Sequence, residues 1–83
     1  MYRVITYPEP LEQLEALPAE ALTAYAEAFG VLELAPMNGR FYNEAKPDGL
    51  RELVFGDQGE GTVTYLILEW QREVHVVLVQ WIG

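Results

Sequence analysis

Cysteine is absent from this chain of 83 residues, histidine occurs once, and Lys and Arg together number five. Without cysteine there is no disulfide framework and no thiol chemistry, which suits a reducing cytoplasm. A single histidine, no cysteine and no Asp-rich loop leave no pattern typical of a metal site. We therefore predict a cytoplasmic protein that uses no metal and no cofactor.

The sequence also lacks any run that approaches the roughly 20 apolar residues of a membrane helix. Its opening, MYRVITYPEP, has only a short apolar run before Pro8, which is not typical of a signal peptide. The chain has 51% hydrophobic residues, and its length of 83 residues allows one small core. The prediction is a single domain, residues 1–83, that does not contact a membrane.

Positive charge is scarce and unevenly placed. Thirteen acidic residues against five basic ones give a net charge of −8. Between Val4 and Gly39 there is no Lys or Arg, whereas six glutamates occur there: Glu9, Glu12, Glu15, Glu20, Glu27 and Glu33. The negative charge of these glutamates repels a phosphate backbone, so general nucleic-acid binding is not expected. The plain interpretation is that these glutamates form an acidic, solvated helix face. Whether or not they also have a specific role, the negative charge favours a partner segment rich in Lys and Arg.

The first half of the chain predicts one strand and two helices. Residues 2–7 are β-prone, residues 10–17 carry Leu at every third position, and residues 19–34 are rich in the helix formers Ala and Glu. Helical spacing in the longer helix predicts a buried stripe made of Leu22, Tyr25, Ala26, Phe29 and Leu32.

The second half predicts three strands, at residues 50–55, 62–69 and 73–82, whose short connections require an antiparallel meander. The order β-α-α-β-β-β is typical of an α+β domain in which a helical hairpin packs on an antiparallel sheet. Strict alternation in the last strand predicts two apolar faces, one with Val74, Val76 and Leu78, the other with His75, Val77, Val79 and Trp81. Because two short helices cover one face, the other meets the long loop or binds another chain, a homodimer included.

The connection at residues 35–49 is long for a compact domain, as functional loops often are. It combines the cations Arg40 and Lys46 with the aromatic residues Phe41 and Tyr42. Contact with a partner and anchoring of the loop to the domain explain this composition equally well. With the end of the last strand, the loop supplies the predicted partner-binding residues Arg40, Tyr42, Gln80 and Trp81.

The run LRELVFG…GTVTYLILE…VHVVLVQW, in this element order, resembles the RelE/ParE superfamily, the small toxins of type II toxin–antitoxin pairs. The resemblance spans the whole chain and rests on the element order and on the phrase Leu-Arg-Glu-Leu-x-Phe-Gly. It implies a RelE/ParE-like fold and a cognate antitoxin as the partner.

The ribonuclease residues that the resemblance would imply are largely missing. Members that cleave mRNA on the ribosome place basic residues on the first meander strand, an Arg before the aliphatic run of the second, and Arg, His or Tyr after the last. Here the first strand offers Arg51 alone. In the Tyr-Arg-x-x-Tyr phrase Thr62 stands in place of Arg and Tyr65 remains, and the sequence continues only to Gly83.

RNA cleavage through the 2′-hydroxyl needs a group that takes its proton, cations that hold the charge of the phosphorane, and an acid for the leaving oxygen. The candidate catalytic set contains one Arg, one Tyr and one His, namely Arg51, Tyr65 and His75. With so few cations, such a site is expected to be nearly silent. The alternatives are a surface pair of Arg51 with Glu60 or Glu69 and a structural role for His75.

Three functional hypotheses follow from the resemblance. In the first, the chain is the toxin-like component of a type II toxin–antitoxin pair, acts mainly by binding a basic antitoxin, and is catalytically weak or silent. In the second, it is a ribosome-dependent mRNA endoribonuclease whose atypical site adds Arg40 or Lys46 from the loop. In the third, it is a gyrase poison or an inert scaffold, because gyrase-poisoning relatives also lack the nuclease residues.

Overall fold

The computed structural model describes residues 1–45 and 49–83, and Lys46 therefore lies outside the described residues. Its elements are β1 (Arg3–Thr6), α1 (Pro8–Glu15), α2 (Ala19–Leu34), the 3-10 helix η1 (Pro36–Asn38), β2 (Arg40–Phe41), β3 (Arg51–Phe55), β4 (Gly61–Leu68) and β5 (Glu73–Trp81). The predicted helices and strands are confirmed, each with ends displaced by no more than about two residues, as is usual for pattern-based boundaries. The short elements η1 and β2, inside the long connection, were not predicted.

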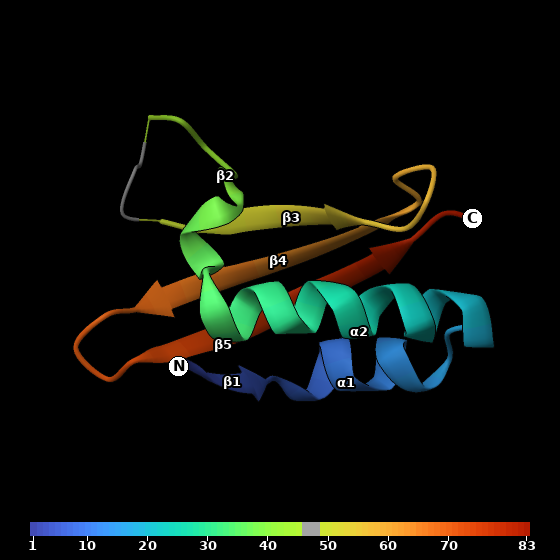
Figure 1. The fold of residues 1–83 in the computed structure, drawn as a ribbon, viewed down its shortest axis with the longest axis horizontal. Helices are drawn as coiled ribbons and strands as arrows, with labels where there is room; N and C mark the ends of the chain where they lie inside the picture. Colours follow the sequence, from blue (N-terminus) through green and yellow to red (C-terminus); the bar gives the residue numbers. More distant parts are fainter. Residues whose placement is uncertain (46–48) are drawn as a thin grey trace.

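The strands form one sheet in the order β1-β5-β4-β3-β2 (Figure 1). The predicted meander β3-β4-β5 is confirmed as antiparallel. The prediction of a wholly antiparallel sheet is wrong at one edge, because β1 pairs with β5 in parallel. A parallel pair requires a long crossover, and here nearly the whole chain, helices included, connects β1 to β5.

Helix α2 packs along one face of the sheet (Figure 1). Tyr25 and Leu32 are buried there, as predicted, but Leu22 is 43% exposed. Ala21 and Ala28 take the remaining buried positions. Neither helix among the described residues is long and apolar enough to cross a membrane.

A β-bulge changes the faces of β5. Thr64 pairs with Leu78 while the next residue, Tyr65, pairs with Val76, so Val77 has no cross-strand partner. The extra residue shifts the pleat, and the predicted strict alternation is therefore wrong beyond Val76. The core face of β5 carries Val74, Val76, Val79 and Trp81.

The opposite face, which we call the open face, carries the half-buried apolar residues Ile5, Leu66, Leu68, Val77 and Leu78. Within residues 35–45, the long connection reaches this face at its edge through Arg40 and leaves the apolar residues uncovered. There η1 lies on the helix side, where the carbonyl of Pro36 accepts a hydrogen bond from the core residue Tyr65. Of the two predicted occupants of this face, the described part of the loop is thus not one, and another chain stays a prediction.

Tyr25 makes alkaline conditions unfavourable for the fold. Its ring packs edge-on against Phe29 and Phe55, its hydroxyl has no hydrogen-bond partner among the described residues, and burial raises its pKa to about 12. The pKa of Tyr25 in the folded protein exceeds the ordinary 10.0. The contribution of Tyr25 to the unfolding free energy is therefore complete below pH 10.0 and is lost as pH rises towards the folded pKa. We expect Tyr25→Phe to stabilise the protein by about 1 kcal/mol near neutral pH. It should also reduce the stability lost between about pH 7 and about pH 11.

Urea-induced unfolding at the two pH values measures both effects. Tyr42→Phe, at a residue that is 57% exposed, is the control and should leave the profile of the natural protein unchanged. Equal alkaline losses in Tyr25→Phe and the natural protein would contradict the assignment.

Candidate functional site

The three predicted catalytic residues do not meet. Arg51 and Tyr65 are cross-strand partners on the helix-covered face, whereas His75 pairs with Leu66 on the open face. Tyr65 is fully buried, and its hydroxyl donates to the carbonyl of Pro36 at 2.5 Å. The sheet therefore separates His75 from the other two, and RNA has no access to Tyr65.

Arg51 anchors the long connection. Its Nη1 donates to the carbonyl oxygens of Met37, at 3.2 Å, and Gly39, at 3.0 Å. The guanidinium carbon also lies 4.2 Å from the centre of the Phe41 ring. The expected surface pair with Glu60 or Glu69 is not formed, because Arg51 faces η1 and β2 instead. Phe41 thus fits the anchoring interpretation of the loop.

Two arginines reach the open face, at its opposite edges. On β2, Nε of Arg40 donates to Oε1 of Glu52 at 2.7 Å, and on β1 the guanidinium of Arg3 binds the carboxylate of Glu73. Three strands lie between β1 and β2, and a strand spacing of about 4.8 Å separates these edges by roughly 19 Å. One phosphodiester cannot contact both guanidinium groups.

The fourth arginine of the described chain, Arg72, lies in the turn between β4 and β5, where it has a left-handed backbone with φ of 55°. Its guanidinium carbon is 4.2 Å from the centre of the Tyr2 ring, and Nη1 is 3.3 Å from the Tyr2 hydroxyl. That hydroxyl also donates to Glu69, which raises the pKa of Tyr2. The amide of Arg3 donates to the carbonyl of Arg72, so these two residues are neighbours. The four described guanidinium groups nevertheless have different partners, which are carboxylates, carbonyl groups and rings.

His75 lies in a side-chain network on the open face that was not predicted. The Tyr7 hydroxyl is 2.8 Å from Nδ1, Nε2 is 3.0 Å from Oε1 of Glu73, and Glu73 also binds Arg3. A carboxylate only accepts, so Nε2 donates to Glu73 and Nδ1 of the neutral imidazole accepts the proton of Tyr7. The parallel pairing of β1 with β5 brings these residues together across 68 to 70 positions of sequence.

The network joins an exposed phenol to a carboxylate through an imidazole, and its cation is already paired. Tyr7 is 40% exposed and ends the chain of hydrogen bonds that runs through His75 to Glu73. Both nitrogens of His75 are occupied. The nearest cation, Arg3, is paired with Glu73.

Glu73 should make the stability of the fold sensitive to acid. Hydrogen bonds from His75 and then from Arg3 hold its pKa below the ordinary 4.5. With a depressed folded pKa, the stabilisation is present above the ordinary value and is lost as pH falls through the folded one. Glu73→Gln is therefore expected to flatten the decline of the unfolding free energy between about pH 6 and about pH 3. Glu9→Gln, at an exposed residue of α1, should retain the decline, and an equal decline in Glu73→Gln would refute the role of this carboxylate.

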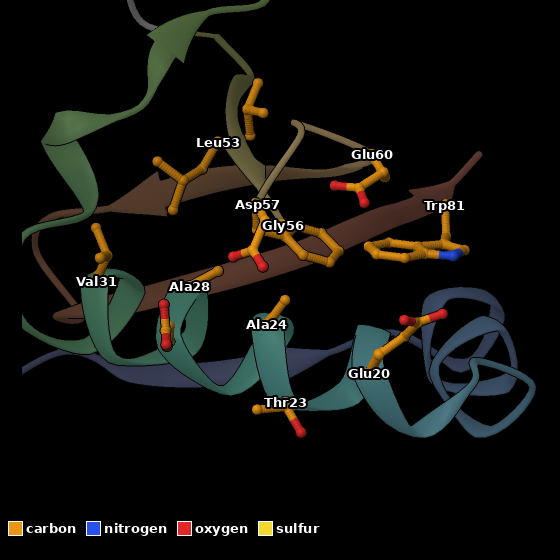
Figure 2. A pocket seen from close by; sticks show the side chains of 13 residues that line it. Glu20, Thr23, Ala24, Ala28, Val31, Leu53, Gly56, Asp57, Glu60 and Trp81 are labelled. Carbon is orange, nitrogen blue, oxygen red and sulfur yellow. The ribbon is translucent and has the colours of Figure 1, made fainter. Parts of the chain in front are cut away.

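A hollow of about 550 Å³ lies on the helix side, between α2 and the turn that joins β3 to β4 (Figure 2). Its apolar lining includes Ala24, Ala28, Leu53, Phe55 and Trp81, and its rim carries the four carboxylates Glu20, Glu27, Asp57 and Glu60. No Lys, Arg or His belongs to its described lining. We call this hollow the acidic groove. The groove was not predicted, because its two walls are far apart along the chain.

The predicted partner-binding residues fall into three places. Arg40 and Gln80 lie on the open face, Tyr42 is exposed in the connection, and Trp81 stacks on Phe55 in the acidic groove with ring centroids 5.9 Å apart. Across the described ranges, no cluster of His, Asp or Glu has the composition of a metal site.

The sequence matches no family model and no curated protein. Solved structures do resemble the fold. The isolated E. coli RelE toxin has a TM-score of 0.81 at 12% identity, over 100% of this chain and 86% of that chain. A chain of the intact E. coli RelBE toxin–antitoxin complex gives 0.79 at 13% identity, over 100% and 99%. A chain of the archaeal RelE–RelB complex from Pyrococcus horikoshii OT3 gives 0.66 at 17%, over 99% and 96%.

These similarities establish the fold. The chain has the RelE-like α+β architecture along its whole length, as the sequence resemblance predicted.

Proposed function

We propose that this chain is the toxin-like component of a type II toxin–antitoxin pair, and that it acts mainly by binding a basic antitoxin. The RelE-like fold supports the class, and two of the compared structures are complexes with the antitoxin RelB. One observation carries the emphasis on binding: each of the four described arginines is already engaged by a carboxylate, a carbonyl or a ring, and the two on the open face lie at opposite edges of the sheet.

RNA cleavage builds negative charge on a phosphorane, which preorganised cations must stabilise. On the open face, Arg3 and Arg40 are each neutralised by a glutamate, at opposite edges of the sheet. Thr62 occupies the position at which the superfamily resemblance would place an Arg. Loss of one such donor typically lowers the rate by about 10²–10³-fold, so weak or absent cleavage is expected.

The features that favour binding are the uncovered apolar strip and the net charge of −8. A partner with an apolar side would cover the strip defined by Ile5, Leu66, Leu68, Val77 and Leu78. A Lys/Arg-rich partner would also lower the repulsion among the thirteen acidic residues. The partner is thus expected to be basic and amphipathic, with an affinity that falls as salt concentration rises.

Co-expression with the product of the adjacent reading frame, followed by affinity purification and size exclusion, tests the proposal. We expect a stable complex that Leu66→Glu, on the open face, disrupts. Leu22→Glu, at an exposed position of α2, is the matched control and should retain the partner. Elution of the chain alone, or as a homodimer that excludes a basic neighbour, would contradict the proposal.

A second candidate function is supported by the Tyr7–His75–Glu73 network, which could serve an atypical ribonuclease in place of the buried Tyr65. For this function, growth arrest on induction should be lost in Tyr7→Phe and kept in Tyr42→Phe. Arrest that does not depend on Tyr7 would eliminate this site.

A further inference from the structure

We infer that the acidic groove is a docking site for a basic amphipathic segment of a protein partner, in addition to the open face. The inference rests on the proposed function, because the segment is assigned to the same basic partner. The groove and the open face lie on opposite sides of the sheet, so such a partner would wrap around the domain.

The apolar floor of the groove has room for anchoring side chains. Ala24 and Ala28 present small side chains from α2, and Leu53 faces them from β3 (Figure 2). Phe55 of β3 belongs to the same lining. The volume of about 550 Å³ is within the roughly 300–1,000 Å³ typical of sites that bury a small ligand. A short row of apolar side chains therefore fits the floor.

The rim selects positive charge. Glu20 and Glu27 are seven positions apart on α2, so they lie on the same side of the helix about two turns apart. Asp57 and Glu60 face them from the turn between β3 and β4. With no cation in the described lining, these four carboxylates repel one another, and Lys or Arg between the two walls would relieve the repulsion.

The wall formed by the turn is held in place before any partner binds. Gly56 and Gly59 have φ of 96° and 73°, and the amide of Gly59 donates to the carbonyl of Gly56 at 3.1 Å. Oε1 of Glu60 accepts from the amide of Gln58 at 2.8 Å. Little ordering is then required on association, which favours affinity.

The combination of floor and rim distinguishes a peptide from a small cation. A polyamine would use only the carboxylates, and an uncharged apolar segment would use only the floor. A segment with Lys or Arg along both edges of an apolar side uses both.

The test uses a synthetic helical peptide of Lys and Leu with one apolar side, and the full chain carrying Trp70→Phe. Trp70 is 98% exposed, and its removal leaves Trp81, in the groove, as the only tryptophan of the sequence. The peptide should change the emission of Trp81. Glu20→Gln with Glu27→Gln should weaken binding by about 2- to 30-fold, from two lost charge pairs. Glu9→Gln with Glu12→Gln, on α1, is the matched control and should not.

Two further peptides decide the chemistry of the occupant. A Lys and Ser peptide of equal charge and a Glu and Leu peptide of equal apolar content should both bind weakly. Equal binding of the Lys and Ser peptide, or an unchanged affinity in the Glu20→Gln, Glu27→Gln variant, would overturn the inference.

The two proposals fail separately. Failure of the Lys and Leu peptide, with the adjacent gene product still bound through the open face, would reject the groove and leave the proposed function intact. Specific peptide binding in the groove, without any complex on co-expression, would leave the groove as a site for basic segments and reject the proposed function.

Discussion

Replacement of Gly39 by alanine is expected to destabilise the protein by about 3 kcal/mol. A Cβ at this position would overlap the hydroxyl oxygen of Tyr65 and lie 2.9 Å from the carbonyl oxygen of Glu52. Tyr65 is fully buried, so its ring cannot move aside without leaving the carbonyl of Pro36 unpaired. Steric overlap in a packed core costs about 1–3 kcal/mol, and an unpaired buried polar group costs about as much again.

Urea-induced unfolding measures the effect. Gly30→Ala is the matched control, because nothing lies within 4 Å of a Cβ added there. In a helix this change should instead stabilise by about 0.5–1 kcal/mol. Adding Tyr65→Phe to Gly39→Ala should recover part of the loss. If Gly39→Ala were as stable as the natural protein, the contact between the connection and the core would not exist in solution.

Arg51→Ala is expected to destabilise the protein by about 2 kcal/mol, because Arg51 is the anchor of η1 and β2. The change removes the hydrogen bonds to Met37 and Gly39 and the stacking on Phe41. Arg51→Lys should recover only part of the loss, since an ammonium cannot bond two carbonyl groups and stack in the same geometry.

Unfolding free energies and hydrogen exchange test this role together. The amide of Tyr42 donates to the carbonyl of Leu50, so it should exchange faster when β2 is no longer anchored. Arg40→Ala removes an exposed ion pair with Glu52 and should cost less than about 1 kcal/mol. Unchanged stability in Arg51→Ala would contradict a structural role and restore Arg51 as a candidate for function.

The local elements could be predicted from sequence because they depend on local patterns. Residues 19–34 have the composition of a helix, and the short turn before β5 allows only an antiparallel partner. The bulge at Val77 could not be predicted, because a strand with one unpaired residue contains the same kinds of residue as a regular strand. The parallel pairing of β1 depends on contacts across almost the whole chain.

The candidate site was harder to predict than the fold. Tyr65 was assigned to catalysis because it matches the last Tyr of the Tyr-Arg-x-x-Tyr motif of the superfamily. It lies two positions from Val63, on the same face of the strand, and both residues are fully buried. That spacing was the available signal for a core residue. The partners of His75, by contrast, depend on the register of β1 against β5, which no local pattern determines.

The scarcity of cations was evident from the sequence, but their engagement was not. A count of five Lys and Arg residues leaves open whether they share one pocket. The fold separates Arg3 from Arg40 by the width of the sheet and turns Arg51 towards the connection. The count alone could not predict this separation.

Translation of a defined mRNA by purified ribosomes, with and without this protein, tests the central claim most directly when the 5′ ends of the mRNA are mapped afterwards. With each described arginine already engaged by another group, the protein should produce no cleavage above that of ribosomes alone. New ends that require the ribosome, and that disappear with Tyr7→Phe or His75→Ala, would contradict it.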